Sequence, residues 1–260
     1  TETHGVFRNI RFTDSVVYSN PAGPLNQRVI GGVSIEVADG GSIDGIIVSG
    51  IRMQFVRAPI FVRLEQRTAG EDSFLRNVRM EGIEAEGAIV TSSITGIPGL
   101  RPSGITISNS HIRTVAQGRA DWAGREIPEA ADKYPEAWMM GRLPAYGFYI
   151  RHADQVELRD LTCIAEQPDE RPAIVCEDVR DATFAGLSLS APAGGAPVFD
   201  LRNAQRVLIT SMQAPAGSRV LAQVSGADSS GIKLTADTLM PGQQAISLVG
   251  DAPPDAVTVE

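Results

Sequence analysis

The chain has 260 residues, of which 43% are hydrophobic and only 5% aromatic, and its formal net charge is −8 at pH 7. This length can bury enough surface for a stable core. The acidic balance argues against a nucleic-acid partner, because neutralising phosphates requires clustered Lys and Arg. No run of about 18 apolar residues is present, so no segment is expected to span a membrane.

A six-residue phrase recurs along the chain, apolar at its first, fourth and sixth places and usually Asn, Asp, Ser or Gly at its third. Copies begin at residues 7, 48, 75, 107, 158, 184 and 209, and those at 107 and 209 fit least well. The last three begin 26 and 25 residues apart. This period is typical of a solenoid, in which stacked units share one core because each is too short to bury its own.

A second set of alternating segments lies between the phrases, most clearly at residues 59–64, 172–177 and 197–202. Alternation with a period of two indicates strands, and each segment opens on Pro, which the first residue of a strand tolerates. The polar third place of the phrase is expected at bends, where short polar side chains bond the backbone. The pattern predicts an all-β, right-handed parallel β-helix as one domain over residues 1–260, with a β-sandwich as the alternative.

The first phrase begins at Phe7 with no polar segment before it to shield the first coil. Solenoids need capping units. We therefore expect N-terminal coils to be missing from this chain, which would make it the C-terminal portion of a longer parent. An uncapped first coil also makes self-association an expectation, head to head about a two-fold axis.

Residues 116–145 break the period and carry both tryptophans, Trp122 and Trp138, together with Tyr134. A long excursion rich in rings can line a sugar cleft, because C–H faces of a pyranose stack on aromatic faces. The rings could instead anchor the excursion against the outside of the β-structure. The spacing of its apolar residues predicts a short helix over residues 126–134.

Four basic residues are candidates for holding the carboxylate of a uronic acid. Arg151 and His152 follow a strand, and Arg offers a two-pronged donor pair. Arg63 and Arg67 lie at the end of another strand. The alternative for Arg151 and His152 is a turn bonded to nearby backbone, and for Arg63 and Arg67 it is a solvated or carboxylate-paired surface position.

The acidic residues and the two thiols indicate no further catalytic or metal site. Glu84 and Glu86 share one strand face, and the turn at Asp169-Glu170 is expected to be solvated, as acidic turns usually are. Cys163 and Cys176 are the only cysteines and have no metal-ligand spacing. We expect buried free thiols, with a disulfide as the alternative, and neither a metal nor a cofactor.

Several stretches carry a resemblance to a known family. They are residues 32–41, 51–53, 58–64, 127–129, 134–136, 143–149 and 151–152. Together they resemble the C-terminal half of bacterial polygalacturonase-like proteins, glycoside hydrolase family 28. The likeness covers roughly residues 3–179, and within it Tyr146 and Tyr149 join the candidates for a substrate groove.

The resemblance implies a right-handed parallel β-helix and inverting hydrolysis of α-linked galacturonides or rhamnogalacturonan. Such hydrolysis uses carboxyl groups roughly 6.5–9.5 Å apart. The Asn-Thr-Asp and Asp-Asp motifs of the family do not occur in this sequence. Thr3-His4-Gly5 falls one residue short of Gly-His-Gly, and Gly231-Ile232-Lys233 comes too late for Arg-Ile-Lys. No catalytic residue is assigned, and this chain alone is expected to be inactive.

The expected role is therefore the scaffold and substrate groove of a pectin-degrading glycosidase, with an acidic polysaccharide or oligosaccharide as partner. A non-catalytic carbohydrate-binding or structural β-helix is the alternative. A polysaccharide lyase on the same architecture would require acid clusters for Ca²⁺ and a basic proton acceptor, and the sequence shows no such cluster. The parent is expected to be secreted or periplasmic, because pectic polymers are extracellular.

Overall fold

The computed structural model of the chain describes residues 4–67, 73–235, 239 and 241–260. Within these residues the chain is almost entirely β-structure, with one short α-helix, α1, at Ala120–Ala123 and 3-10 helices at Leu25–Gln27 and Ala193–Gly195. The strands are β1 (Gly5–Tyr18), β2 (Gly31–Val37), β3 (Gly41–Gln54), β4 (Ala58–Leu64), β5 (Leu75–Ala88), β6 (Ser92–Thr95), β7 (Ser103–Thr114), β8 (Phe148–Ala165), β9 (Ile174–Ala185), β10 (Ser188–Leu189), β11 (Phe199–Arg202), β12 (Gln205–Thr210), β13 (Val220–Ser225), β14 (Ile232–Leu234), β15 (Gln244–Leu248) and β16 (Val257–Val259).

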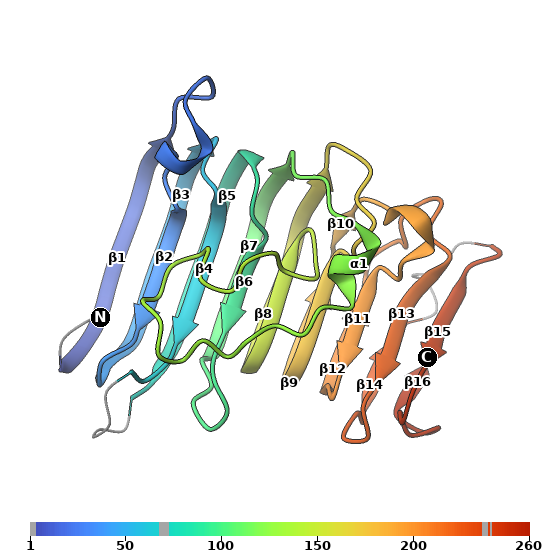
Figure 1. Cartoon of the computed structure of the whole chain (residues 1–260). Coiled ribbons are helices and arrows are strands. Elements are labelled where there is room, and N and C mark those ends of the chain that lie inside the picture. The colour runs from blue at the N-terminus through green and yellow to red at the C-terminus, as the bar shows by residue number, and fades with distance from the viewer. Residues whose placement is uncertain (1–3, 68–72, 236–238, 240) are drawn as a thin grey trace.

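The strands pair in parallel along the length of the molecule. The main order is β1-β3-β5-β7-β8-β9-β11-β13-β15, and β2-β4-β6-β8 and β9-β12-β14-β16 join it at the side (Figure 1). Every pair of these described strands is parallel. The expectation of a parallel all-β protein is confirmed, and the β-sandwich alternative is wrong because sandwiches are built from antiparallel strands.

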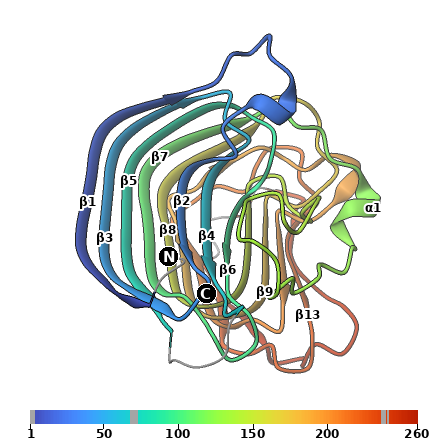
Figure 2. The ribbon, with the colours of Figure 1, turned by 60° about the vertical axis from the view of Figure 1, so that its left-hand side comes forward.

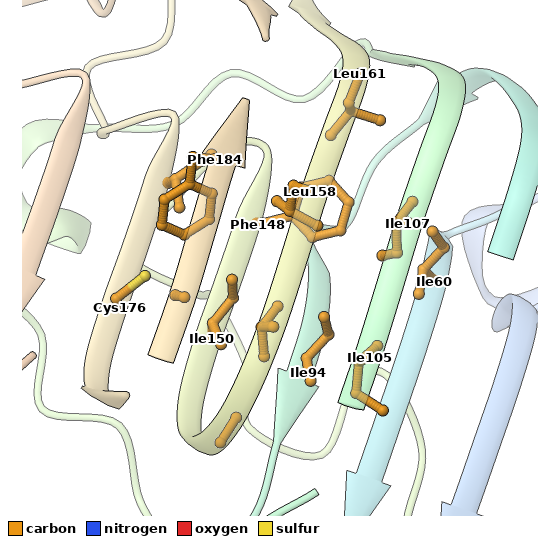
Figure 3. Packing of buried hydrophobic residues seen from close by; sticks show 14 of the residues in the cluster. Ile60, Ile94, Ile105, Ile107, Phe148, Ile150, Leu158, Leu161, Cys176 and Phe184 are labelled. Atoms are coloured by element: carbon orange, nitrogen blue, oxygen red, sulfur yellow. The ribbon is translucent and has the colours of Figure 1, made fainter. Parts of the chain in front are cut away.

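The core consists of apolar columns that run across the strands. One column takes one residue from each of nine strand segments: Phe12, Val48, Met80, Ile107, Leu158, Phe184, Ile209, Leu234 and Val259. Its seven inner members are at most 3% exposed, whereas Phe12 and Val259 at the two ends are 50% and 46% exposed. The ribbons follow nested curved paths around this core (Figure 2), and Figure 3 shows part of its packing. Each repeat is therefore buried by its neighbours on both sides.

The third place of the recurring phrase lies at a bend in every copy, as predicted. The seven residues have φ between 48° and 65°, the left-handed region that Gly, Asn and Asp tolerate best: Asn9, Gly50, Asn77, Asn109, Asp160, Gly186 and Ser211. They occupy two different bends. Asn9 and Asn77 lie beside Gly45, whereas Gly50 lies beside Asp14, five residues further along. The copies of the phrase therefore come from two corners of the repeat, which explains their uneven spacing early in the chain.

The excursion at 116–145 contains only the helix α1, so the helix expected over residues 126–134 is wrong. Ala130 has φ 50°, which ends any right-handed helix at that point. The main-chain carbonyls of Ile127 and Glu129 accept hydrogen bonds from arginines of the sheet instead of from their own segment. These contacts join residues far apart in sequence, so a local pattern could not reveal them.

Cys163 and Cys176 are both buried and free, as expected. Burial raises the pKa of the Cys163 thiol to about 12 and raises that of Cys176 as well, so both behave as small apolar core residues. Among the described residues, no helix is long and apolar enough to cross a membrane.

Candidate functional site

The excursion at 116–145 lies across the outer face of the sheet formed by β4, β6, β8 and β9 (Figure 1). A second apolar cluster, separate from the main core, joins the two. The sheet contributes Phe61, Tyr149 and Val175, and the excursion contributes Ile127, Ala137, Met140 and Leu143. Aliphatic side chains anchor the excursion to the outside of the sheet. Trp122 adds a contact, since the guanidinium carbon of Arg171 lies 5.6 Å from the centre of its ring.

A column of polar residues on the same outer face holds the main chain of the excursion. The residues Glu36, Arg63, Thr95, Arg151, Glu177, Arg202 and Ser225 are in register on successive strands. The three arginines donate to the carbonyl oxygens of Glu129 at 2.6 Å, Ile127 at 2.7 Å and Ala123 at 2.6 Å, respectively. Because carbonyl groups of a loop need partners when buried, this column fixes where the excursion lies.

Arg63, predicted to bind a substrate carboxylate, is 1% exposed. It donates from Nε to Glu65 Oε2 at 2.7 Å and from Nη1 to the carbonyl oxygen of Gly96 at 2.9 Å. Burial raises the pKa of Glu65, although the bond from Arg63 opposes that rise. In this structure, the donors of Arg63 hold the protein together. Arg151 is similarly occupied, since its guanidinium also pairs with Glu129 and lies 3.3 Å from Glu177.

His152 joins the excursion to the sheet through both ring nitrogens. Its Nδ1 lies 2.7 Å from Asp178 Oδ2, and its Nε2 lies 3.1 Å from Glu129 Oε1. Burial tends to raise the pKa of Asp178, but bonds from His152 and Arg101 outweigh it and the pKa is lowered. His152 and Asp178 are both bend residues with positive φ, at 47° and 50°. His152 lies at a bend within β8, and its ring is bonded to carboxylates, not to nearby backbone as in the turn alternative.

The three other candidates, Tyr146, Tyr149 and Arg67, are each bonded to other groups of the protein. Tyr149 is fully buried and donates to Glu177 Oε2 at 3.0 Å, while Tyr146 donates to the carbonyl oxygen of Ser190 at 2.7 Å. Burial raises the pKa of both phenols, so both stay protonated. Arg67 pairs with Asp39 and lies with its guanidinium 5.3 Å from the ring of Tyr134. The carboxylate-paired alternative for Arg67 is therefore the one observed.

Trp122 and Trp138 come together in one cavity of about 130 Å³. The cavity opens between the excursion and the loop that follows β5, and its lining residues are Ile89, Val90, Thr91, Ala116, Gln117, Trp122, Trp138, Gly141, Arg142, Leu143 and Arg171. Trp138 is 48% exposed and lines the cavity. Among the described residues that line the cavity, none is acidic.

Arg142 is the cation of this cavity, and sequence reasoning missed it. Its guanidinium carbon lies 4.1 Å from the centre of the Trp122 ring, which is a cation–π contact, and the residue is exposed. Stacking uses the face of the guanidinium and leaves its N–H groups at the edge. No local signal marks this residue, because a single Arg in a polar loop resembles any solvated one.

The inner wall of the cavity is a buried ion pair. Arg171 donates to Asp169 through Nε at 2.9 Å and Nη2 at 2.7 Å, and through Nη1 to the carbonyl oxygen of Leu143 at 3.0 Å. Asp169 is 2% exposed, so the expectation of a solvated turn is wrong for Asp169, whereas Glu170 beside it is exposed. The pair neutralises Arg171, which leaves Arg142 as the charged group available in the cavity.

Glu84 and Glu86 share one face of β5, as predicted, and line a shallow depression with His111 and Arg113. In the described part of the chain, no group of three or more His, Cys, Asp and Glu side chains is placed to hold a metal ion. The chain matches no model of a known protein family, and no curated protein is significantly similar to it.

Proposed function

We propose that this chain is a right-handed parallel β-helix that binds an acidic, pectin-type polysaccharide at the cavity formed by Trp122, Trp138 and Arg142. In this proposal, it supplies the scaffold and part of the substrate groove of a polygalacturonase-like hydrolase of glycoside hydrolase family 28. The observation that carries the proposal is the meeting of two indole rings and an exposed guanidinium in one cavity with no acidic lining residue.

The chemistry of this cavity suits a uronic acid. The C–H face of a pyranose can stack on the exposed part of Trp138, while the carboxylate takes the two-pronged donor edge of Arg142. The chain as a whole is acidic, with a net charge of −8, so a polyanion would be repelled from most of its surface. A locally basic pocket is what would direct such a ligand to one place.

Hydrolysis is proposed to depend on carboxyl groups that this chain does not supply. Three acidic residues where the excursion meets the sheet are paired with basic side chains: Glu65 with Arg63, Glu129 with Arg151, and Asp178 with His152. An inverting hydrolase needs a free acid and a free base on opposite sides of the sugar. The lack of an acid among the cavity residues also favours the second candidate, a carbohydrate-binding β-helix without catalysis.

Calorimetric titration with short galacturonic-acid oligomers tests the proposal. We expect saturable binding that weakens with added salt, and no release of reducing ends from polygalacturonate by the chain alone. Arg142→Gln should weaken binding by roughly tenfold or more, the effect of losing a hydrogen bond to a charged group. Arg125→Gln is the matched control, because Arg125 is exposed in the same excursion but does not line the cavity.

Four outcomes would count against the proposal. Equal loss in both variants would mean that only net charge matters, and undiminished binding by Arg142→Gln would place the ligand elsewhere. Equal affinity for neutral glucose oligomers would remove the acidic substrate class. Measurable hydrolysis by residues 1–260 would show that catalytic carboxyl groups are present in this chain.

A further inference from the structure

A second cavity, of about 200 Å³, lies beside the cavity of the two tryptophans and shares no lining residue with it. Trp122 lines the first cavity and Ala123 the second, and Arg171 and Pro172 are divided between the two in the same way. Consecutive residues of a chain are only about 3.8 Å apart. The two cavities are therefore neighbours, and each has its own set of side chains.

Polar side chains of two neighbouring strands, β11 and β13, line this second cavity. Asp200 is in register with Gln223, and Arg202 with Ser225. The residues that alternate with these four along the two strands belong to the main core. Because successive side chains of a strand point to opposite faces, all four polar side chains are directed away from the core and toward the cavity.

Asp200 carries a buried oxygen that lacks a hydrogen-bond donor. The residue is 5% exposed, and its Oδ2 accepts from Arg202 through Nε at 3.0 Å and Nη2 at 2.6 Å. Its Oδ1 accepts no hydrogen bond from any described residue. Within the described part of the chain, the side chains of Gln223 and Ser225 are also not bonded to the protein. A buried polar oxygen without a partner is costly, so a donor brought by a ligand is favoured at this place.

We propose that this cavity binds a neutral, hydroxyl-rich sugar ring. A hydroxyl group can donate one hydrogen bond and accept others, which suits Oδ1 of Asp200, the hydroxyl group of Ser225 and the side-chain amide of Gln223. Ligand sites usually combine a few such polar groups with an otherwise apolar lining. The other lining residues are small or apolar and suit the C–H surface of a sugar: Ala123, Gly124, Pro172, Ala196 and Pro197.

The charges at the cavity favour a neutral ring over an acidic one. Arg202 is paired with Asp200 and also donates to the carbonyl oxygen of Ala123 at 2.6 Å, so its positive charge is already balanced. A ligand carboxylate would instead face the unbonded oxygen of Asp200, and like charges repel. The tryptophan cavity is the opposite case, because Arg142 is exposed there and no acidic residue lines it. This inference therefore does not depend on the acidic ligand proposed for that cavity.

NMR titration of the isotope-labelled 260-residue chain with galactose, glucose and xylose, one at a time, tests the inference. We expect at least one of these sugars to shift the main-chain amide signals of β11 and β13 in a saturable way. Galacturonic acid should bind there at least tenfold more weakly. Gln223→Met keeps the length of the side chain but removes its amide, and it should weaken sugar binding about fivefold, the effect of losing one uncharged hydrogen bond.

Gln205→Met is the matched control, because Gln205 is also partly buried, on β12, but does not line the cavity. It should leave sugar binding unchanged. Ser225→Ala guards against the case in which Gln223→Met disturbs the strand, and it should weaken binding as well. The tryptophan cavity is followed in the same titration through the indole signals of Trp122 and Trp138, so a failure at one cavity is distinguished from a failure at the other.

Three outcomes would overturn the inference. The first is that none of the three neutral sugars shifts the amide signals of β11 and β13. The second is that both Gln223→Met and Ser225→Ala bind the sugar as well as the unchanged chain does. The third is that galacturonic acid binds at these strands as tightly as the neutral sugars.

Discussion

The apolar column from Phe12 to Val259 allows the same substitution, Phe to Ala, to be compared at a buried and at a half-exposed position. Phe184 lies near the middle, is 0% exposed, and its ring centre is 5.4 Å from that of Phe199 at an angle of 48°. Phe12 occupies the end of the same column and is 50% exposed. Replacing each with Ala therefore removes the same atoms from two different degrees of burial.

The expected losses follow from the buried area. A Phe side chain buries roughly 150–250 Å², which at roughly 25 cal/mol per Å² corresponds to about 4 to 6 kcal/mol for full burial. We expect Phe184→Ala to lower the free energy of unfolding by about 4 kcal/mol, within the range for such core truncations. Phe12→Ala should cost about 2 kcal/mol, because half of its surface is already in water.

Urea unfolding followed by circular dichroism measures both values. Equal losses for the two variants, or a loss below about 1 kcal/mol for Phe184→Ala, would refute the continuous column, because core truncations of Phe normally cost several times more.

Three other predictions concern the site and the buried groups. Trp138→Ala should weaken oligogalacturonate binding about tenfold: if a sugar covers half of the exposed ring, roughly 60 Å² at roughly 25 cal/mol per Å² gives about 1.5 kcal/mol, and unchanged affinity in calorimetry would contradict this. The pKa of Asp178 is lowered, so its pairing stabilises the fold above pH 3.8, the ordinary Asp pKa, and this stabilisation is lost as pH falls through the lowered pKa. In acid, the free energy of unfolding of Asp178→Asn should therefore depend less on pH than that of the unchanged chain. An equal pH dependence in the two would contradict the pairing. Cys163 should resist a thiol reagent at pH 8 while the chain is folded, since its pKa is raised to about 12, and react after denaturation; rapid labelling of the folded chain would contradict its burial.

The recurring phrase made the strands predictable because its third place lies at a bend, and the backbone geometry of a bend restricts which residue types can stand there. Left-handed backbone favours Gly, Asn and Asp, so the third place of the phrase records the bend directly in the sequence. What the phrase could not show is that each repeat has two such bends. Asn9 and Gly50 look alike in sequence, yet they lie in different corner columns, and only the strand register separates them.

The candidate site was less predictable because contacts distant in sequence determine it. Arg63 resembles an exposed strand-end residue, since Arg is rarely buried without partners. Its burial depends on a carbonyl oxygen 66 residues later, at Glu129. The period break at 116–145 did reveal the excursion and its two tryptophans. It could not reveal that Trp122 stacks on Arg142, because this contact exists only once the excursion has docked on the sheet.

A crystal structure of the chain soaked with a galacturonic-acid trimer tests the central claim most directly. The account predicts sugar density in the cavity, with one ring on the exposed face of Trp138 and a carboxylate within hydrogen-bonding distance of Arg142. A trimer bound elsewhere on the surface, or an empty cavity under saturating ligand, would contradict it.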